Sequence, residues 1–121
     1  MTTRALTRYR KGLWAETEAC WALRLKGYRI VARRFKTRLG EIDVIAVRGR
    51  TLAIVEVKAR ATRDLAASAI SPHQQQRLIR AAHLFLAAHP SYADHIVRFD
   101  ALLVTPFGWP LHLPSAFEAA G

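Results

Sequence analysis

The sequence predicts an α/β fold in which helices cover both faces of a mixed sheet. Three consecutive segments are rich in Val, Ile and Ala, the composition of buried strands. A segment with helical spacing precedes them, and a second helix and a further strand follow. The expected order, αβββαβ, is typical of a three-layer α-β-α sandwich.

The chain opens with a basic segment and a helix. Residues 1–11 carry Arg and Lys but no acid, and we interpret them as a basic N-terminal arm, with an organelle transit segment as the alternative. A helix is expected over residues 13–26, where small and apolar residues recur at helical spacing up to Gly27. Residues 12–121 are then expected to form a single domain.

Three strands are expected next. They fall at residues 28–35, 41–47 and 51–58, and the turn at residues 48–50 joins the last two as an antiparallel hairpin. Residues 59–70 are predicted to be a loop.

The second helix has clear signals at both ends. Ser71 can cap it and Pro72 suits its first turn, while His89 and Pro90 end it. A strand is expected over residues 96–105. The proline-containing remainder is expected to be irregular and packed on the body of the domain.

Composition favours a polyanionic partner. The 121 residues include 19 Lys and Arg against 9 Asp and Glu, a net charge of +10, which favours nucleic acid or an anionic membrane surface. An acidic protein partner is the alternative. No apolar run approaches the roughly 18 residues of a membrane span, so no membrane partner is expected. A single cysteine, Cys20, excludes a disulfide framework, and a cytoplasmic location is expected.

Charged residues interrupt two predicted strands, where burial should exclude them. Side chains alternate along a strand, so Glu41 shares a face with Asp43, and Glu56 with Lys58. If the strands are neighbours, Asp43, Glu56 and Lys58 converge. Two carboxylates holding Mg²⁺ or Mn²⁺, with Lys58 beside the attacking water, would suit phosphodiester hydrolysis. The competing interpretation is a buried ion network that only specifies the fold.

Residues 40–46 and 55–60 together resemble the paired signature of the YraN family of bacterial proteins. Further matches, which bring the resemblance to most of residues 12–117, are Gly27-Tyr28, Arg98-Phe99-Asp100 and Pro114-Ser115-Ala116-Phe117. That family resembles the PD-(D/E)XK, restriction-endonuclease-like superfamily, and especially Holliday-junction resolvases. The resemblance implies metal ligation by Asp43 and Glu56, Lys58 beside the water, and Glu16 as a further carboxylate from the first helix.

The chain departs from the family pattern at three positions. Ala15 replaces a glycine of the first helix, Arg34 replaces a common asparagine, and Gln74 stands where a lysine is expected. Loss of the lysine would weaken a phosphate contact. Gln74 is either a solvated helix residue or an accessory site residue, and Glu41 is a second accessory candidate.

Basic residues on both sides of the proposed site are the candidate nucleic-acid contacts. They are Arg33, Arg34, Lys36 and Arg38 before the first acidic strand, and Arg60 and Arg63 after the second. Any one alone would be an ordinary solvated charge, so the expectation depends on the cluster. Trp14 and Trp21, seven residues apart, are expected to belong to the core more than to stack on bases.

The function favoured by these observations is metal-dependent cleavage of structured or branched DNA. Symmetric cutting of two strands would require a homodimer. The first alternative is a catalytically inactive nucleic-acid-binding module on the same fold, and the second is an accessory subunit of an acidic protein. A junction, a flap, a single strand and RNA all remain open as substrates.

Overall fold

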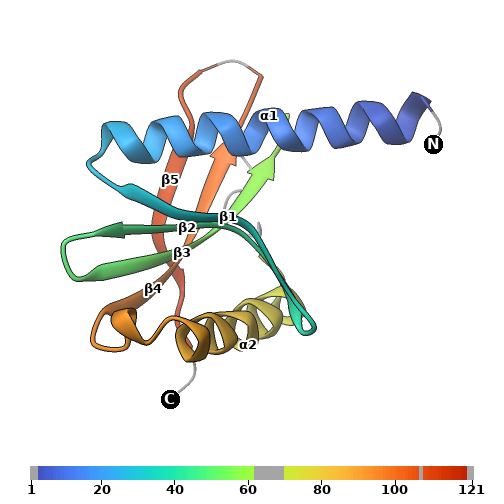
Figure 1. The fold of residues 1–121 in the computed structure, drawn as a ribbon. Coiled ribbons are helices and arrows are strands. Elements are labelled where there is room, and N and C mark those ends of the chain that lie inside the picture. Colours follow the sequence, from blue (N-terminus) through green and yellow to red (C-terminus); the bar gives the residue numbers. More distant parts are fainter. Residues whose placement is uncertain (1–2, 62–69, 107, 120–121) are drawn as a thin grey trace.

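The structure, a computed structural model, describes residues 3–61, 70–106 and 108–119, and for residues 3–11 it describes the backbone alone. Helices α1 (Thr3–Leu25) and α2 (Pro72–Ala88) lie on opposite faces of a sheet (Figure 1). Within the described residues the sheet has five strands in the order β1-β2-β3-β4-β5. The predicted α/β class and three-layer sandwich are confirmed. No helix in these ranges is long and apolar enough to cross a membrane.

The sheet is mixed because one connection crosses over. The strands are β1 (Arg29–Thr37), β2 (Gly40–Arg48), β3 (Thr51–Ala59), β4 (Ile96–Val104) and β5 (Leu111–Phe117). Neighbouring strands are antiparallel except β3 and β4, which are parallel. Parallel neighbours need a long connection, and α2 with the short 3₁₀ helix η2 (Pro90–Tyr92) supplies the return to β4.

The predicted elements are present, with two corrections. Helix α1 begins at Thr3, so the described part of the predicted arm is helical; it contains no Pro or Gly before Gly12 to end a helix. The tail predicted to be irregular forms β5. Pro114 is tolerated there because β5 is an edge strand, where a missing N–H leaves no ladder partner unpaired. Of the predicted loop, residues 62–69 lie outside the described residues.

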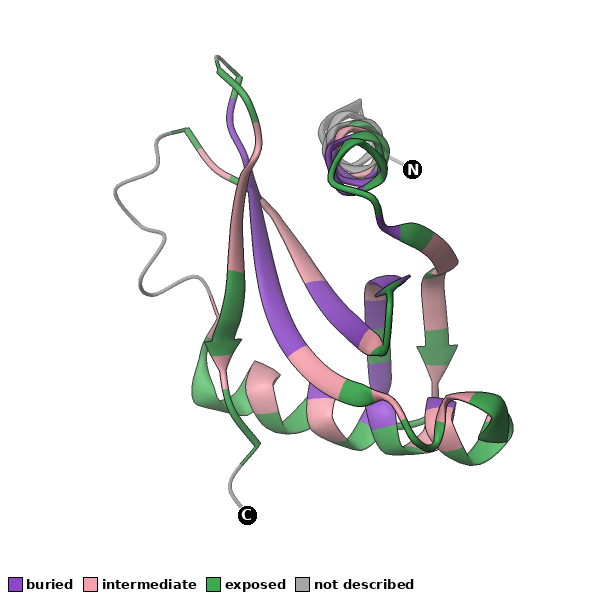
Figure 2. Cartoon of the chain, turned by 90° about the vertical axis from the view of Figure 1, so that its left-hand side faces the viewer, coloured by how far each residue is buried: buried purple, intermediate pink, exposed green. Residues whose placement is uncertain are grey.

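Successive strand residues supply two separate cores, one on each face. Val55 packs in the cluster beneath α1 with Ala19 and Leu23, whereas Ile54 packs in the cluster above α2 with Phe85. Figure 2 shows buried residues concentrated in the middle of the strands between the two helices. Strand alternation therefore explains why β2 and β3 are apolar on both faces.

The helix facing the first core uses small residues to approach the sheet. Ala15 is 2% exposed and Ala19 is fully buried, whereas Trp14 is 46% and Trp21 58% exposed. The expectation that the two tryptophans belong to the core is wrong, because the buried stripe of α1 consists of small residues. At the other helix, Ser71 Oγ accepts a hydrogen bond from the Gln74 backbone N–H, as the capping prediction required.

A buried ion cluster attaches β5 to the sheet. The fully buried Asp100 of β4 receives two hydrogen bonds of 2.8 Å from the guanidinium of Arg98. His112 Nε2 lies 2.8 Å from the same carboxylate, and the Ser115 backbone N–H donates to it at 3.0 Å. Burial raises the pKa of Asp100, but these three hydrogen-bonding partners together bring it below the ordinary value. The motif Arg98-Phe99-Asp100 thus has a structural role at the edge of the sheet.

Asp100→Asn is expected to lower the free energy of unfolding by about 3 kcal/mol, because Arg98 would lose its partner in a buried ion pair. Urea denaturation at pH 7 measures the change. Asp94→Asn is the matched control, since Asp94 pairs with Arg50 in solvent and should matter little. Equal stabilities of the two variants would contradict this role for Asp100.

Candidate functional site

The site begins where two paired strands separate. Pairing between β2 and β3 runs from Arg48 opposite Thr51 to Val44 opposite Val55, whereas β1 and β2 remain paired as far as Gly40. We call the point beyond Val44 and Val55 the fork. The β1–β2 hairpin continues past the fork and reaches the side of α2 (Figure 1).

The hairpin packs closely against α2 at Gly40. A Cβ atom at this position would lie 3.4 Å from both the Cβ and the carbonyl oxygen of Arg77, at the near limit of ordinary van der Waals contact. A side chain larger than that of alanine would therefore meet the helix.

Asp43 spans the fork. Its Oδ2 accepts a hydrogen bond of 2.8 Å from the backbone N–H of Val57 on β3. A buried N–H without a partner is costly, and here a carboxylate takes the place of a strand carbonyl. Asp43 and Glu56 are thereby brought together, as strand alternation predicted.

Burial raises the proton affinity of both carboxyl groups. Burial, followed by the nearby charge of Glu56, raises the pKa of Asp43 to about 7 despite the Val57 hydrogen bond. Burial also raises the pKa of Glu56, against the opposing effects of Lys58 and of a hydrogen bond with Asp43. Lys58 Nζ lies 3.3 Å from Glu56 Oε1, with both side chains less than 15% exposed. The predicted trio therefore assembles.

Glu16 reaches the site from α1 but is already paired. Its side chain is 8% exposed, and both of its carboxylate oxygens lie 3.0 Å from Nε of Arg34. Arg34 has a φ of 51°, a left-handed conformation that is unusual for a residue with a side chain. The structure thus joins a predicted metal ligand to a predicted nucleic-acid contact.

All of these side chains except Lys58 line one hollow of about 340 Å³, which we call the carboxylate hollow. Its described lining is Glu16, Arg34, Glu41, Asp43, Glu56, Gln74, Arg77 and Leu78. Both accessory candidates, Glu41 and Gln74, are therefore present. Arg77 was missed by the sequence analysis, although it lies three residues after Gln74 and hence on the same helix face.

A divalent cation fits Asp43 and Glu56 better than it fits all three predicted ligands. Within the described ranges, no group of three or more His, Cys, Asp or Glu side chains is arranged to hold a metal ion. Glu16 is directed to Arg34 instead. Mg²⁺ needs only one or two carboxylates and fills its other positions with water and phosphate. Burial, the largest cause of the raised pKa values of Asp43 and Glu56, disfavours their ionised forms, and a bound cation would offset that cost.

A second hollow of about 660 Å³ adjoins the first at the hairpin tip. Arg77 and Glu41 line both, and Lys36, Arg38 and His73 add to the second, which we call the basic hollow. Two of the predicted nucleic-acid contacts therefore lie next to the carboxylates.

The remaining predicted contacts are dispersed. Arg33 donates to Thr17 Oγ1 of α1 at 3.2 Å, and Arg60 lies past the end of β3, donating to the carbonyl of Ala59. Arg63 lies outside the described residues.

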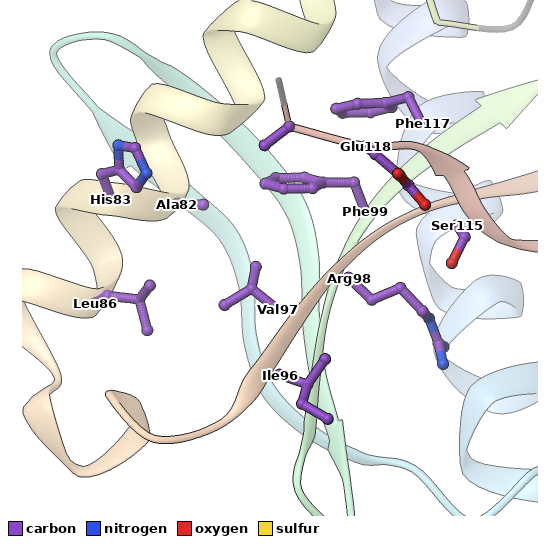
Figure 3. Close-up of a pocket in the computed structure, with 11 residues that line it drawn as sticks. Ala82, His83, Leu86, Ile96, Val97, Arg98, Phe99, Ser115, Phe117 and Glu118 are labelled. Carbon is purple, nitrogen blue, oxygen red and sulfur yellow. The ribbon is translucent and has the colours of Figure 1, made fainter. Parts of the chain in front are cut away.

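A hollow of about 480 Å³ between α2 and the β4–β5 edge shares no described lining residue with the carboxylate hollow. In Figure 3 the stacked rings of Phe99 and Phe117 lie near His83 and Leu86 of α2. This lining is mainly apolar, and its Arg98 is bound to Asp100. Its other ionisable residues are His83 and Glu118, and its described lining lacks the pair of neighbouring acids found at the fork.

The raised pKa of Asp43 predicts an unusual pH dependence for the metal-free protein. The folded state holds the proton up to about pH 7, whereas the unfolded chain releases it near 3.8. Stability should therefore fall as pH rises between these values. Asp43→Asn should flatten this slope and make the protein more stable than the wild type at pH 8, by on the order of 2 kcal/mol.

Urea denaturation in the presence of a chelator, at several pH values, measures this effect. The exposed Asp94→Asn serves as control and should keep the wild-type slope. Because the pKa of Glu56 is also raised, part of the slope should remain; a slope in Asp43→Asn as steep as that of the wild type would show that Asp43 titrates normally.

Comparison with known proteins identifies close relatives in bacteria. A UPF0102 protein of Rhodopseudomonas palustris strain BisB18 is 56% identical over 112 residues, which are 93% of this chain and 83% of the relative. A UPF0102 protein of Parvibaculum lavamentivorans is 56% identical over 113 residues, 93% of this chain and 85% of the relative. One from Methylorubrum populi is 57% identical over 108 residues, 89% and 86% of the two chains. The family-level resemblance is thereby confirmed: the chain belongs to the uncharacterised protein family UPF0102, which matches residues 15–104.

Proposed function

We propose that this protein is a metal-dependent nuclease acting on DNA. The observation that carries the proposal is the pair of partly buried carboxyl groups, Asp43 and Glu56, held at an open fork with Lys58 beside Glu56. Perturbed carboxyl groups in a hollow are typical of functional sites. The resemblance to the PD-(D/E)XK superfamily, in which an acid and a Glu-x-Lys pair form the site, supports the same function.

Each group has a role in this proposal. Asp43 and Glu56 would hold Mg²⁺ or Mn²⁺, which when bound would polarise a water and stabilise charge on the phosphate. Lys58 orients the attacking water and offsets the charge of Glu56. Arg77, shared by the carboxylate and basic hollows, is placed to contact a phosphate next to the one that is cleaved.

The competing function is nucleic-acid binding without hydrolysis, and one observation favours it. Arg34 neutralises Glu16, so that the carboxylate contributed by α1 is not free for a metal. Under this alternative, only the basic hollow would bind nucleic acid.

Under either function, replacing Lys36 and Arg38 with alanine should weaken DNA binding and lower its salt dependence.

Two substitutions separate metal binding from chemistry. Asp43→Asn should abolish Mn²⁺ binding measured by calorimetry, because one of two ligands is lost. Lys58→Ala should retain the ion and lower the cleavage rate about 100-fold or more. The substrates are labelled single-stranded, duplex and branched DNA.

Asp94→Asn, which removes an exposed carboxylate outside the site, should behave as the wild type in both assays. Undiminished cleavage by Asp43→Asn would exclude the proposed site. DNA binding without cleavage in Mg²⁺ or Mn²⁺ would favour the binding module.

A further inference from the structure

A hollow of about 590 Å³ lies where α1 passes the ends of β3 and β4. Its described lining is Trp14, Ala59, Arg60, Ala61, Val104 and Pro106, and we call it the tryptophan hollow. Nearly all of this lining is apolar, with one guanidinium at its edge. Trp14 is 46% exposed, so the indole is open to a ligand and contributes little to the core.

Helix geometry places the tryptophan hollow and the carboxylate hollow on opposite sides of one turn of α1. Consecutive helical residues point about 100° apart, so Trp14 and Glu16 project on either side of Ala15. Ala15 is buried against the sheet. Glu16 then lines the carboxylate hollow, and Trp14 lines the tryptophan hollow. A single turn of α1 therefore contributes one lining residue to each hollow.

Strand β3 also connects the carboxylate hollow with the tryptophan hollow. It carries Glu56 and Lys58 and leads directly to Arg60, four residues beyond Glu56 or about 13 Å along an extended chain. The backbone N–H of Arg60 donates to the Val104 carbonyl at 2.9 Å, which fixes this end of β3 against β4. A stacked strand rises about 3.4 Å per nucleotide, so the two hollows are a few nucleotides apart.

We propose that the tryptophan hollow binds an unpaired nucleobase, and that the substrate is therefore DNA with a single-stranded segment. The inference rests on the proposed function, because the base belongs to the strand whose phosphate lies at the carboxylate hollow. An indole provides a stacking surface that accepts any base, and a guanidinium can contact the base face or the adjacent phosphate. A base held in a duplex stack cannot expose its face to Trp14.

The chemistry of the lining also predicts weak sequence preference. Ala59, Val104 and Pro106 offer no polar side chain to read the edge of a base. Stacking and charge would then supply the affinity, and binding should tolerate different bases. The net charge of +10 favours this occupant over a neutral apolar segment of a protein.

The test measures binding of a labelled oligothymidylate and of a blunt duplex hairpin to the full chain in the presence of a chelator. Trp14→Ala should weaken oligothymidylate binding about tenfold and leave duplex binding nearly unchanged. Trp14→Phe should restore most of the loss, because a phenyl ring still stacks. Trp21→Ala is the matched control: it removes an equally exposed tryptophan, 58% accessible, seven residues further along α1.

The outcomes separate this inference from the proposed function. Selective loss with Trp14→Ala and no cleavage with any metal would support the base-binding hollow and reject hydrolysis. Metal-dependent cleavage with unchanged oligothymidylate affinity in Trp14→Ala would overturn the hollow and leave the nuclease proposal standing. Equal losses in Trp14→Ala and Trp21→Ala, or equal losses for both DNA forms, would also overturn it.

Discussion

The hydrogen bond from the Val57 backbone to Asp43 is the constraint on which the arrangement of the site depends. Where β2 and β3 separate at the fork, a strand N–H loses its ladder partner and needs another acceptor. A carboxylate satisfies it but is costly to bury in ionised form. The separation of the two strands therefore creates the opening. Burial and the neighbouring charge of Glu56 raise the pKa of Asp43, the acid that spans it. Gly40, packed on the backbone of Arg77, keeps the hairpin in the position this geometry requires.

Around the fork, each layer of the sandwich contributes a different kind of group. Helix α1 supplies Glu16, the sheet supplies the Asp43–Glu56 pair, and α2 supplies Gln74 and Arg77. Four carboxylates thus share the described lining with two guanidinium groups. One guanidinium, that of Arg34, is directed to Glu16. Lys58 offsets the charge of Glu56 at 3.3 Å, so Asp43 is the member of the pair that would gain most from a cation.

The contacts that could be predicted from the sequence are those between strands joined by a short turn. Alternation along two strands joined by a short turn is enough to place Asp43, Glu56 and Lys58 together. The pairing of Glu16 with Arg34 depends instead on how α1 crosses β1, and the conversion of the tail into β5 depends on buried groups of β4. Exposure of the tryptophans was missed because helical spacing identifies a face without saying which face meets the sheet. Metal and DNA contacts stay predictions.

Asp100, which is fully buried, and Asp43, which is partly buried, differ in how completely their carboxylates are satisfied by hydrogen bonds. Asp100 receives donors from Arg98, His112 and the Ser115 backbone, and its pKa is lowered. Asp43 accepts from one backbone N–H and faces a second acid, and its pKa is raised. Asp100 therefore has little need of a further cation, whereas Asp43 gains from one. This difference, more than burial alone, supports the proposal of a metal ion at the fork.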